Sequence, residues 1–196
     1  MNKEKLAHFI SFIFGPIFLW PLILFLIVFN SGLPILQQQK ILQIVFILQI
    51  FMPLVLFIIA LLMRIISDFD ISQKEERYLP MVVFSELSVI NLMLVRLYGN
   101  DLLFNFFLLL FLIIIINVLI TIFWKISSHA TINIVAIVLI NYFFHWQYPY
   151  LFLSLPVIFW ARLYLKRHTI AQLIGGFIIN GGLLIYFLYF QNYLKL

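Results

Sequence analysis

Long apolar runs, separated by short polar segments, dominate the hydrophobic pattern of this chain. A helix that crosses a bilayer needs about 20 mostly apolar residues, and fewer where its ends are buried in protein. Seven runs meet or approach this requirement: residues 9–29, 41–63, 81–97, 102–123, 130–144, 150–161 and 170–190. The pattern therefore predicts an all-α polytopic integral membrane helix bundle with six to seven transmembrane helices. Residues 1–196 are expected to form a single transmembrane domain.

Composition supports this class and removes several others. Hydrophobic residues make up 65% of the chain and charged residues 10%, whereas soluble domains are roughly half apolar and a quarter charged. A membrane β-barrel would show short alternating segments in place of continuous apolar runs. With no cysteine, the chain has neither a disulfide framework nor a thiolate metal site. No basic stripe with interleaved aromatic residues is present, so nucleic acid is excluded as a partner.

Alternation of the spans predicts which polar segments share a membrane face. One face, side A, receives residues 1–8, 67–80, 124–129 and 162–169, and the opposite face receives the other turns. Nine Lys and Arg residues fall on side A and three on the other face, so the positive-inside rule makes side A cytoplasmic. Setting aside the candidate phosphate ligands Arg77, Lys125 and Arg162 leaves six against three. The expected location is a bacterial inner (plasma) membrane.

Two apolar runs, 132–144 and 150–160, form a predicted hairpin that places its polar ends on side A. Ser127, His129, Arg162 and His168 then lie at the ends of neighbouring helices. Arginine matches phosphate oxygens with a planar fork, and helix starts attract anions. Two histidines can divide nucleophile and general-acid roles, and clustered ionisable groups in membrane segments are usually functional. The pattern therefore predicts a phosphate or diphosphate site. A metal site is not predicted, because no carboxylate pair or His/Glu ligand spacing accompanies these residues.

These residues also carry a family resemblance. Ile126-Ser127-Ser128-His129 is similar to a Pro-Ser-Gly-His motif, and the stretch from Ala161 to Gln172 is similar to Ser-Arg, five residues, His, three residues, Asp. Both motifs belong to the type 2 phosphatidic acid phosphatase superfamily, which is related to haloperoxidases. The chain resembles a divergent membrane branch with Lys-Ile-Ser-x-His and His-x-x-x-Gln better than it resembles the parent family. A third motif, Lys, six residues, Arg-Pro, is only loosely matched by residues 74–80, and the phosphatase-like core would cover about residues 68–182.

The resemblance implies a membrane lipid phosphatase that needs neither metal nor cofactor. His168 would attack phosphorus and form a phosphohistidine, and His129 would protonate the leaving group and then activate water. Gln172 would replace the aspartate that orients the nucleophilic ring. The substrate would be a lipid phosphate monoester or an isoprenoid diphosphate, presented among membrane lipids. The implied phosphate-binding residues are Arg162, Arg77, Ser127, Ser128, Lys125 and Lys74.

Two departures from the family pattern keep an alternative open. An amide at Gln172 accepts a hydrogen bond but cannot stabilise an imidazolium as a carboxylate does, and an Asp-to-Asn change in the serine protease triad costs about ten-thousand-fold in turnover. Ser128 replaces the motif's glycine and crowds the phosphate cradle. The alternative is a catalytically impaired homologue that binds a lipid headgroup or a membrane protein. A third option, a magnesium-dependent prenyltransferase, rests on Asp68 and Asp70 alone and lacks a second aspartate-rich motif.

Four features of the sequence also have a purely structural interpretation. Arg77 is either a phosphate ligand or one more solvated loop charge. Thr169 is a plausible N-cap for the last span. The small residues at 175–176 and 181–182 predict a surface where two helices approach closely. Prolines within the spans, Pro16 among them, are expected to kink helices and not to take part in chemistry.

Overall fold

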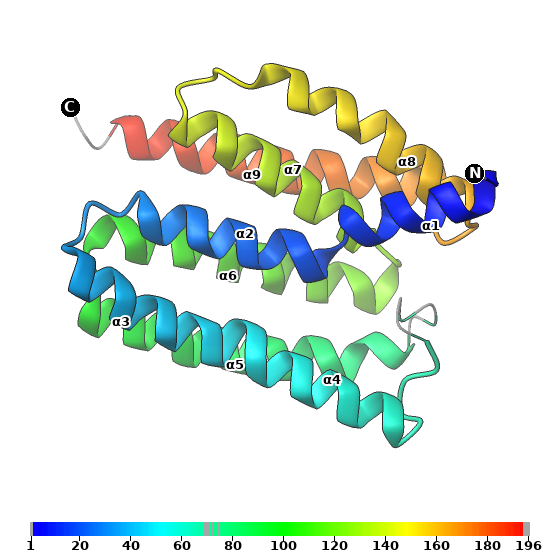
Figure 1. The fold of residues 1–196 in the computed structure, drawn as a ribbon, viewed down its shortest axis with the longest axis horizontal. Helices are drawn as coiled ribbons and strands as arrows, with labels where there is room; N and C mark the ends of the chain where they lie inside the picture. The colour runs from blue at the N-terminus through cyan, green and yellow to red at the C-terminus, as the bar shows by residue number, and fades with distance from the viewer. Residues whose placement is uncertain (1, 69–70, 72, 74, 194–196) are drawn as a thin grey trace. The chain divides into compact units, whose positions relative to one another are not determined.

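The computed structural model describes residues 2–68, 71, 73 and 75–193, with side chains up to residue 190, and all regular structure in these residues is helical. The elements are drawn in Figure 1. In chain order they are α1 (Lys3–Ile13), α2 (Pro16–Phe29), α3 (Ile35–Phe46), the π-helical turn η1 (Ile47–Phe51), α4 (Met52–Leu62), η2 (Glu75–Arg77), α5 (Tyr78–Tyr98), α6 (Asp101–Phe123), α7 (Ser128–Phe143), η3 (Pro149–Leu153), α8 (Ser154–Tyr164) and α9 (Ile170–Tyr193).

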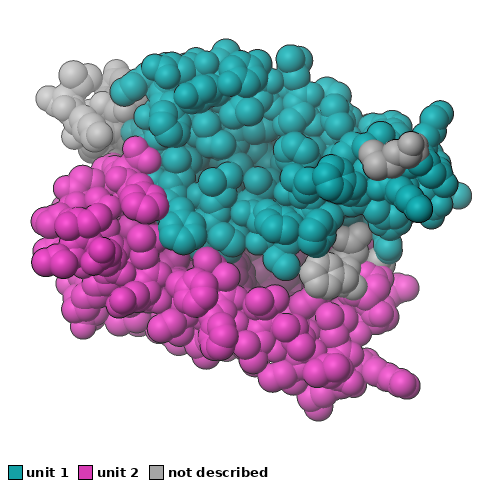
Figure 2. Space-filling model, viewed as in Figure 1, with its two compact units in different colours: residues 1–26, 126–196 teal, residues 27–125 magenta. Residues whose placement is uncertain are grey.

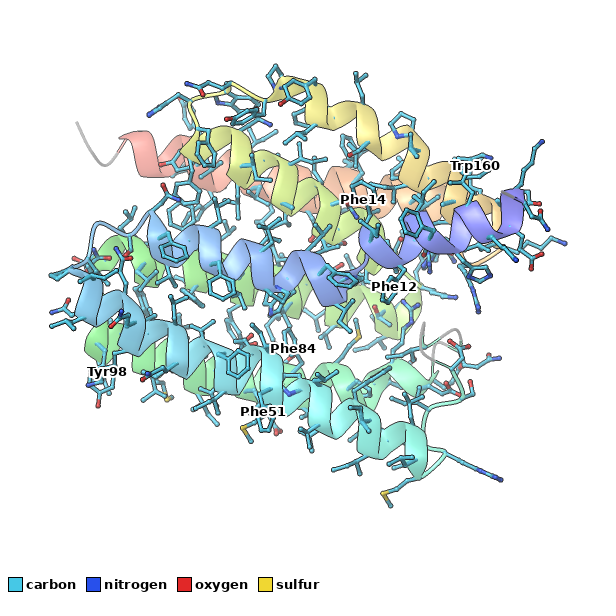
Figure 3. The ribbon with its side chains drawn as sticks, in the orientation of Figure 1. Phe12, Phe14, Phe51, Phe84, Tyr98 and Trp160 are labelled. Carbon is cyan, nitrogen blue, oxygen red and sulfur yellow. The ribbon has the colours of Figure 1, made fainter. Side chains whose placement is uncertain are left out.

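Helix length and composition agree with a membrane protein. Among the described residues, five helical segments are long and apolar enough to cross a bilayer: Lys3–Phe29, Ile35–Leu62, Glu75–Tyr98, Asp101–Phe123 and Ile170–Phe190. Two shorter apolar segments, Ser128–Phe143 and Pro149–Tyr164, correspond to the fifth and sixth predicted spans. Side chains along the helices are mostly hydrocarbon, as around Phe51 and Phe84 (Figure 3). The all-helical part of the prediction is confirmed, and five of the predicted spans correspond to helices that could cross a membrane.

The chain divides into two compact units (Figure 2). Unit 1 comprises Met1–Leu26 and Ile126–Leu196, and unit 2 comprises Ile27–Lys125. Unit 2 is therefore an insertion in sequence between the first and last parts of unit 1. The boundaries of the expected core at 68–182 coincide with neither unit.

Unit 2 contains three long helical segments that run back and forth. Its first segment begins at Ile35, directly after Pro34, so the helix starts before the predicted span that begins at residue 41. Gln37 to Lys40 are helical because Gln and Lys are good helix formers. At the turn into α6, Asn100 accepts a hydrogen bond from the Leu103 N–H at 2.9 Å and donates to the Ser31 carbonyl at 2.8 Å.

Unit 1 is built on α7, whose residues are buried around most of its circumference. Small residues let α9 approach it closely. A Cβ placed on Gly176 would lie 2.9 Å from the Ser127 carbonyl oxygen, and one on Gly181 would lie 3.2 Å from Ile134 Cγ1. Asn180 donates to Thr131 Oγ1 at 2.9 Å across the same surface. The predicted packing role is confirmed for Gly176 and Gly181, whereas a Cβ on Gly182 would meet nothing within 4 Å.

The first predicted span is a helix with a break. α1 ends at Ile13 and α2 begins at Pro16, with Phe14 and Gly15 between them. Proline lacks an N–H and is well suited to the first position of a helix. The Gly15 N–H donates to the Phe12 carbonyl at 3.1 Å, whereas in a continuous α-helix it would donate to the carbonyl of Ser11. The break therefore withdraws the helical donor from the Ser11 carbonyl.

Candidate functional site

The start of α7 supplies Ser127 and His129. Ser127 is the N-cap, and its hydroxyl accepts a hydrogen bond from the Ala130 N–H at 3.3 Å, as a capping serine does. Ser128 is the first helical residue and is exposed, whereas His129 on the same turn is buried. Capping thus fixes the backbone from which the imidazole of His129 projects.

Arg162 lies in the last turn of α8 and is 1% exposed. A cation in this position complements the partial negative charge at a helix C-terminus. Its Nη1 donates to Ser11 Oγ on α1 at 2.5 Å. A guanidinium this deeply buried needs hydrogen-bond acceptors, and the hydroxyl of Ser11 is one of them.

His129 also contacts Ser11. Its Nε2 lies 3.1 Å from the Ser11 carbonyl oxygen and 3.5 Å from Ser11 Oγ. Because a carbonyl oxygen can only accept, the hydrogen in this contact must be carried by Nε2. Ser11 therefore joins the imidazole of His129 to the guanidinium of Arg162.

His168 and Gln172 form the second part of the site, where the chain enters α9. Gln172 Oε1 lies 3.3 Å from His168 Nδ1 and accepts the Thr169 N–H at 3.1 Å, while the Gln172 N–H donates to Thr169 Oγ1 at 3.3 Å. The last two bonds are a capping box, which confirms Thr169 as the N-cap. The Thr169 N–H requires the amide oxygen on its side, so His168 Nδ1 is the donor to that oxygen. In the neutral ring, Nε2 then keeps the lone pair.

The two parts of the site meet through the backbone. The Ser127 N–H donates to the Gln172 carbonyl at 3.4 Å, and α7 and α9 approach closely at Gly176. On the other side of α7, Asn133 Nδ2 donates to the Phe14 carbonyl and to the His129 carbonyl, at 2.8 Å each. Figure 1 shows α1, α7, α8 and α9 converging in this region of unit 1, and Phe14 and Trp160 mark it in Figure 3.

The structure therefore groups five of the predicted site residues in unit 1: His129, Arg162, Ser127, His168 and Gln172. Ser128 belongs to the same helix start, but its side chain is exposed. Arg77 and Lys125 belong to unit 2, and Lys74 lies outside the described residues. A buried guanidinium, two imidazoles and a helix start form a set that can bind an anion and transfer protons.

Arg77 is not a solvated loop charge, and that interpretation is wrong. Its side chain is 6% exposed, and its Nε donates to the Ile71 carbonyl at 2.9 Å. In the same segment, Glu76 Oε2 accepts the N–H and the hydroxyl of Ser67, both at 2.9 Å. The side chains of Arg77 and Glu76 thus form hydrogen bonds within the segment between α4 and α5.

Two features of the site were not predicted. Ser11 contacts residues more than a hundred positions away, and no local pattern reveals such a pairing. The capping box was visible in the sequence, because Thr169 and Gln172 have the spacing that defines it. The family resemblance alone accounts for Gln172 only as a substitute for aspartate.

Comparisons of the chain with protein-family models, with curated proteins and with solved structures find no match. Within the described residues, no three His, Cys, Asp or Glu side chains are grouped as a metal site would need. Asp70, on which the prenyltransferase alternative depends, lies outside those residues. The function is therefore inferred from the arrangement of side chains in unit 1.

Proposed function

We propose that this protein is a lipid phosphatase of a bacterial inner (plasma) membrane, with seven spans that include the shorter α7 and α8. The reaction is metal-independent hydrolysis of a lipid phosphate monoester or an isoprenoid diphosphate. One observation carries the proposal. His168 Nδ1 faces an amide oxygen, so Nε2 keeps a nucleophilic lone pair in the unit that also contains buried His129 and Arg162.

The hydrolysis takes place in two steps, formation of a phosphohistidine and its hydrolysis. The lone pair of His168 Nε2 attacks phosphorus, the bond from phosphorus to the leaving oxygen breaks, and protonated His129 gives its proton to that oxygen. Water then attacks the phosphohistidine, the P–N bond breaks, and the proton of the water passes to His129. Phosphate leaves, and both imidazoles return to their starting state.

Arg162 and the start of α7 stabilise charge in these steps. A guanidinium binds phosphoryl oxygens through two parallel hydrogen bonds. Because Arg162 is 1% exposed, water screens its charge weakly, and the interaction with a developing negative charge is strengthened. The partial positive charge at the N-terminus of α7 adds a second source of positive potential.

A lipid substrate suits the flank of this site. Tyr164 at the end of α8 and Ile170 at the start of α9 are 43% and 61% exposed, and they bracket His168 in sequence. Apolar and aromatic side chains at this position can contact acyl or prenyl chains while the phosphate enters the polar site. A soluble phosphate ester would gain nothing from such a flank.

Phosphate release from purified protein in detergent tests the proposal. Phosphatidate, phosphatidylglycerophosphate and an isoprenoid diphosphate are offered with and without chelator. We expect chelator-resistant release from at least one substrate, abolished by His168→Ala, and an acid-labile phosphoryl group on the wild-type protein only. A folded sample that releases phosphate from none of them would refute the proposal, and chelator-sensitive prenyl transfer would support the prenyltransferase.

A second candidate function is favoured by the capping box. Gln172 is fully explained as the partner of Thr169 at the start of α9, without reference to a reaction. The protein would then bind a lipid phosphate headgroup without hydrolysing it. Saturable binding of a radiolabelled lipid phosphate, lost in Arg162→Gln and without release in wild type, would identify this function.

A further inference from the structure

Ser11 on α1 contacts both His129 and Arg162. We propose that Ser11 is a positioning residue whose backbone carbonyl holds His129 with its hydrogen on Nε2, so that Nδ1 is the nitrogen that exchanges protons. The Gly15-Pro16 helix break makes this carbonyl available. The use of Nδ1 in hydrolysis rests on the proposed function, whereas the position of the hydrogen does not.

The Ser11 carbonyl does not receive the hydrogen bond that a continuous helix would give it. In an unbroken helix the Gly15 N–H would bind it. Here that N–H binds the Phe12 carbonyl instead, at 3.1 Å, and Pro16 has no N–H to offer Phe12. A buried carbonyl oxygen without a partner costs free energy. The Nε2–H of His129 at 3.1 Å supplies the donor that the break removed.

The end of α1 packs against the first turns of α7. Asn133 donates to the Phe14 carbonyl and to the carbonyl of His129, so a single amide binds the break to the turn that carries the imidazole. A Cβ on Gly15 would lie 3.0 Å from the Ser11 carbonyl oxygen and 3.5 Å from His129 Nε2. Glycine at this position keeps the space in which the two groups meet.

Substitutions can separate the contribution of the Ser11 hydroxyl from that of the Ser11 carbonyl. The hydroxyl of Ser11 binds Arg162, and its carbonyl binds His129. Ser11→Ala removes the first contact and retains the second. Gly15→Ala combined with Pro16→Ala favours a continuous helix, which returns the carbonyl of Ser11 to the N–H of residue 15. Pro21→Ala is the matched control, because Pro21 lies inside α2 beyond the break.

Nitrogen NMR of ¹⁵N-histidine-labelled protein in detergent reads the hydrogen position directly. The chain has 4 histidines, so each signal is assigned by a single substitution, and spectra are taken at a pH where the rings are neutral. We expect His129 as the Nε2–H form and His168 as the Nδ1–H form. The pattern of His129 should change in the Gly15→Ala/Pro16→Ala variant and persist in Ser11→Ala and Pro21→Ala. An Nδ1–H form of His129 in wild type, or an unchanged pattern in the double variant, would overturn the proposal.

Kinetics then distinguish this inference from the proposed function. If the protein hydrolyses a lipid phosphate, Ser11→Ala should raise KM with the shape of the pH–rate profile retained. The double variant should lower kcat by roughly a hundredfold, as expected for a mispositioned general acid, and alter the limb that His129 controls. Hydrolysis with an Nδ1–H form of His129 would refute the inference alone. An Nε2–H form without any hydrolysis would refute the proposed function alone.

Discussion

Gln172 uses a single amide oxygen for two hydrogen bonds. The oxygen accepts the Thr169 N–H, which closes the capping box of α9, and it faces His168 Nδ1. The geometry of the first bond determines which way the amide points, and this in turn determines which nitrogen of the ring carries the hydrogen. Helix capping and imidazole orientation are therefore coupled in one side chain.

This coupling predicts the effect of a carboxylate at the same position. Glutamate completes a capping box as well as glutamine does, and it also stabilises a cationic imidazole. We expect Gln172→Glu to raise the rate of phosphate release by about tenfold, which corresponds to roughly 1.4 kcal/mol in the barrier. The initial rate with the best lipid phosphate measures the change. A slower enzyme that retains its thermal stability would contradict the assigned role of this side chain.

Adjacent serines at the start of α7 give a second prediction. Ser127 Oγ caps the helix by accepting the Ala130 N–H, while Ser128 is exposed. Replacing an N-cap serine with alanine costs about 1 kcal/mol. We expect Ser127→Ala to lower the thermal midpoint in detergent, with Ser128→Ala close to wild type. Equal losses in both variants would mean that the hydroxyl of Ser127 does not cap α7.

At the scale of elements, the two helices of the short hairpin differ in burial: α7 is enclosed by protein, and α8 has an exposed apolar face. α7 has 16 residues and is about 24 Å long, which is shorter than the roughly 30 Å hydrocarbon core. Its residues are mostly buried, whereas an exposed stripe starts at Leu153 of η3 and continues along α8 with Val157 and Trp160. Protein surrounds the helix that carries the site, and the apolar stripe of α8 is suited to lipid.

Close packing of α7 and α9 predicts a strong position effect among glycines. A Cβ on Gly176 would approach the Ser127 carbonyl oxygen to 2.9 Å, whereas a Cβ on Gly182 would meet nothing within 4 Å. We expect Gly176→Ala to destabilise the protein by about 1–3 kcal/mol, as overpacking does. Gly182→Ala should be neutral or slightly stabilising, because alanine is the better helix former. Thermal unfolding of both variants in one detergent provides the measurement, and equal midpoints would contradict the packing described here.

Sequence patterns predicted the local features of these elements better than the distant ones. The apolar runs located every long helix, and the hairpin placed Arg162 and His168 near the start of α7, because helix periodicity and chain reversal are local properties. The contact of Ser11 with His129 depends on a carbonyl that a helix break makes available, and on the packing of α1 against α8. Nothing within a short window of sequence encodes that packing.

At the scale of the whole molecule, the insertion of unit 2 separates the two parts of unit 1 in sequence. Residues Ile27–Lys125 lie between α1 and the start of α7, yet Ser11, His129 and Arg162 are in direct contact. The site of unit 1 is therefore assembled from both ends of the chain. A folding unit of this kind is complete only after α7 and α8 have been synthesised, so the contacts of α1 must form late.

The membrane topology of the hairpin provides the last prediction. Because the chain has no cysteine, single cysteines introduced at exposed positions of unit 1 report which membrane face they occupy. Lys3 is the first residue of α1, Gln147 lies between α7 and η3, and Lys166 follows α8, and all three are exposed. If both short helices cross the bilayer, a membrane-impermeant maleimide should label Lys3→Cys and Lys166→Cys from one side and Gln147→Cys only from the other. Labelling of all three from the same side would mean that α7 and α8 form a re-entrant hairpin. The chain would then cross the membrane five times, and the site would lie where the hairpin enters and leaves the membrane. Tyr150 and Tyr164, near the two ends of the apolar segment Pro149–Tyr164, favour two crossings, because tyrosine concentrates at both membrane–water interfaces.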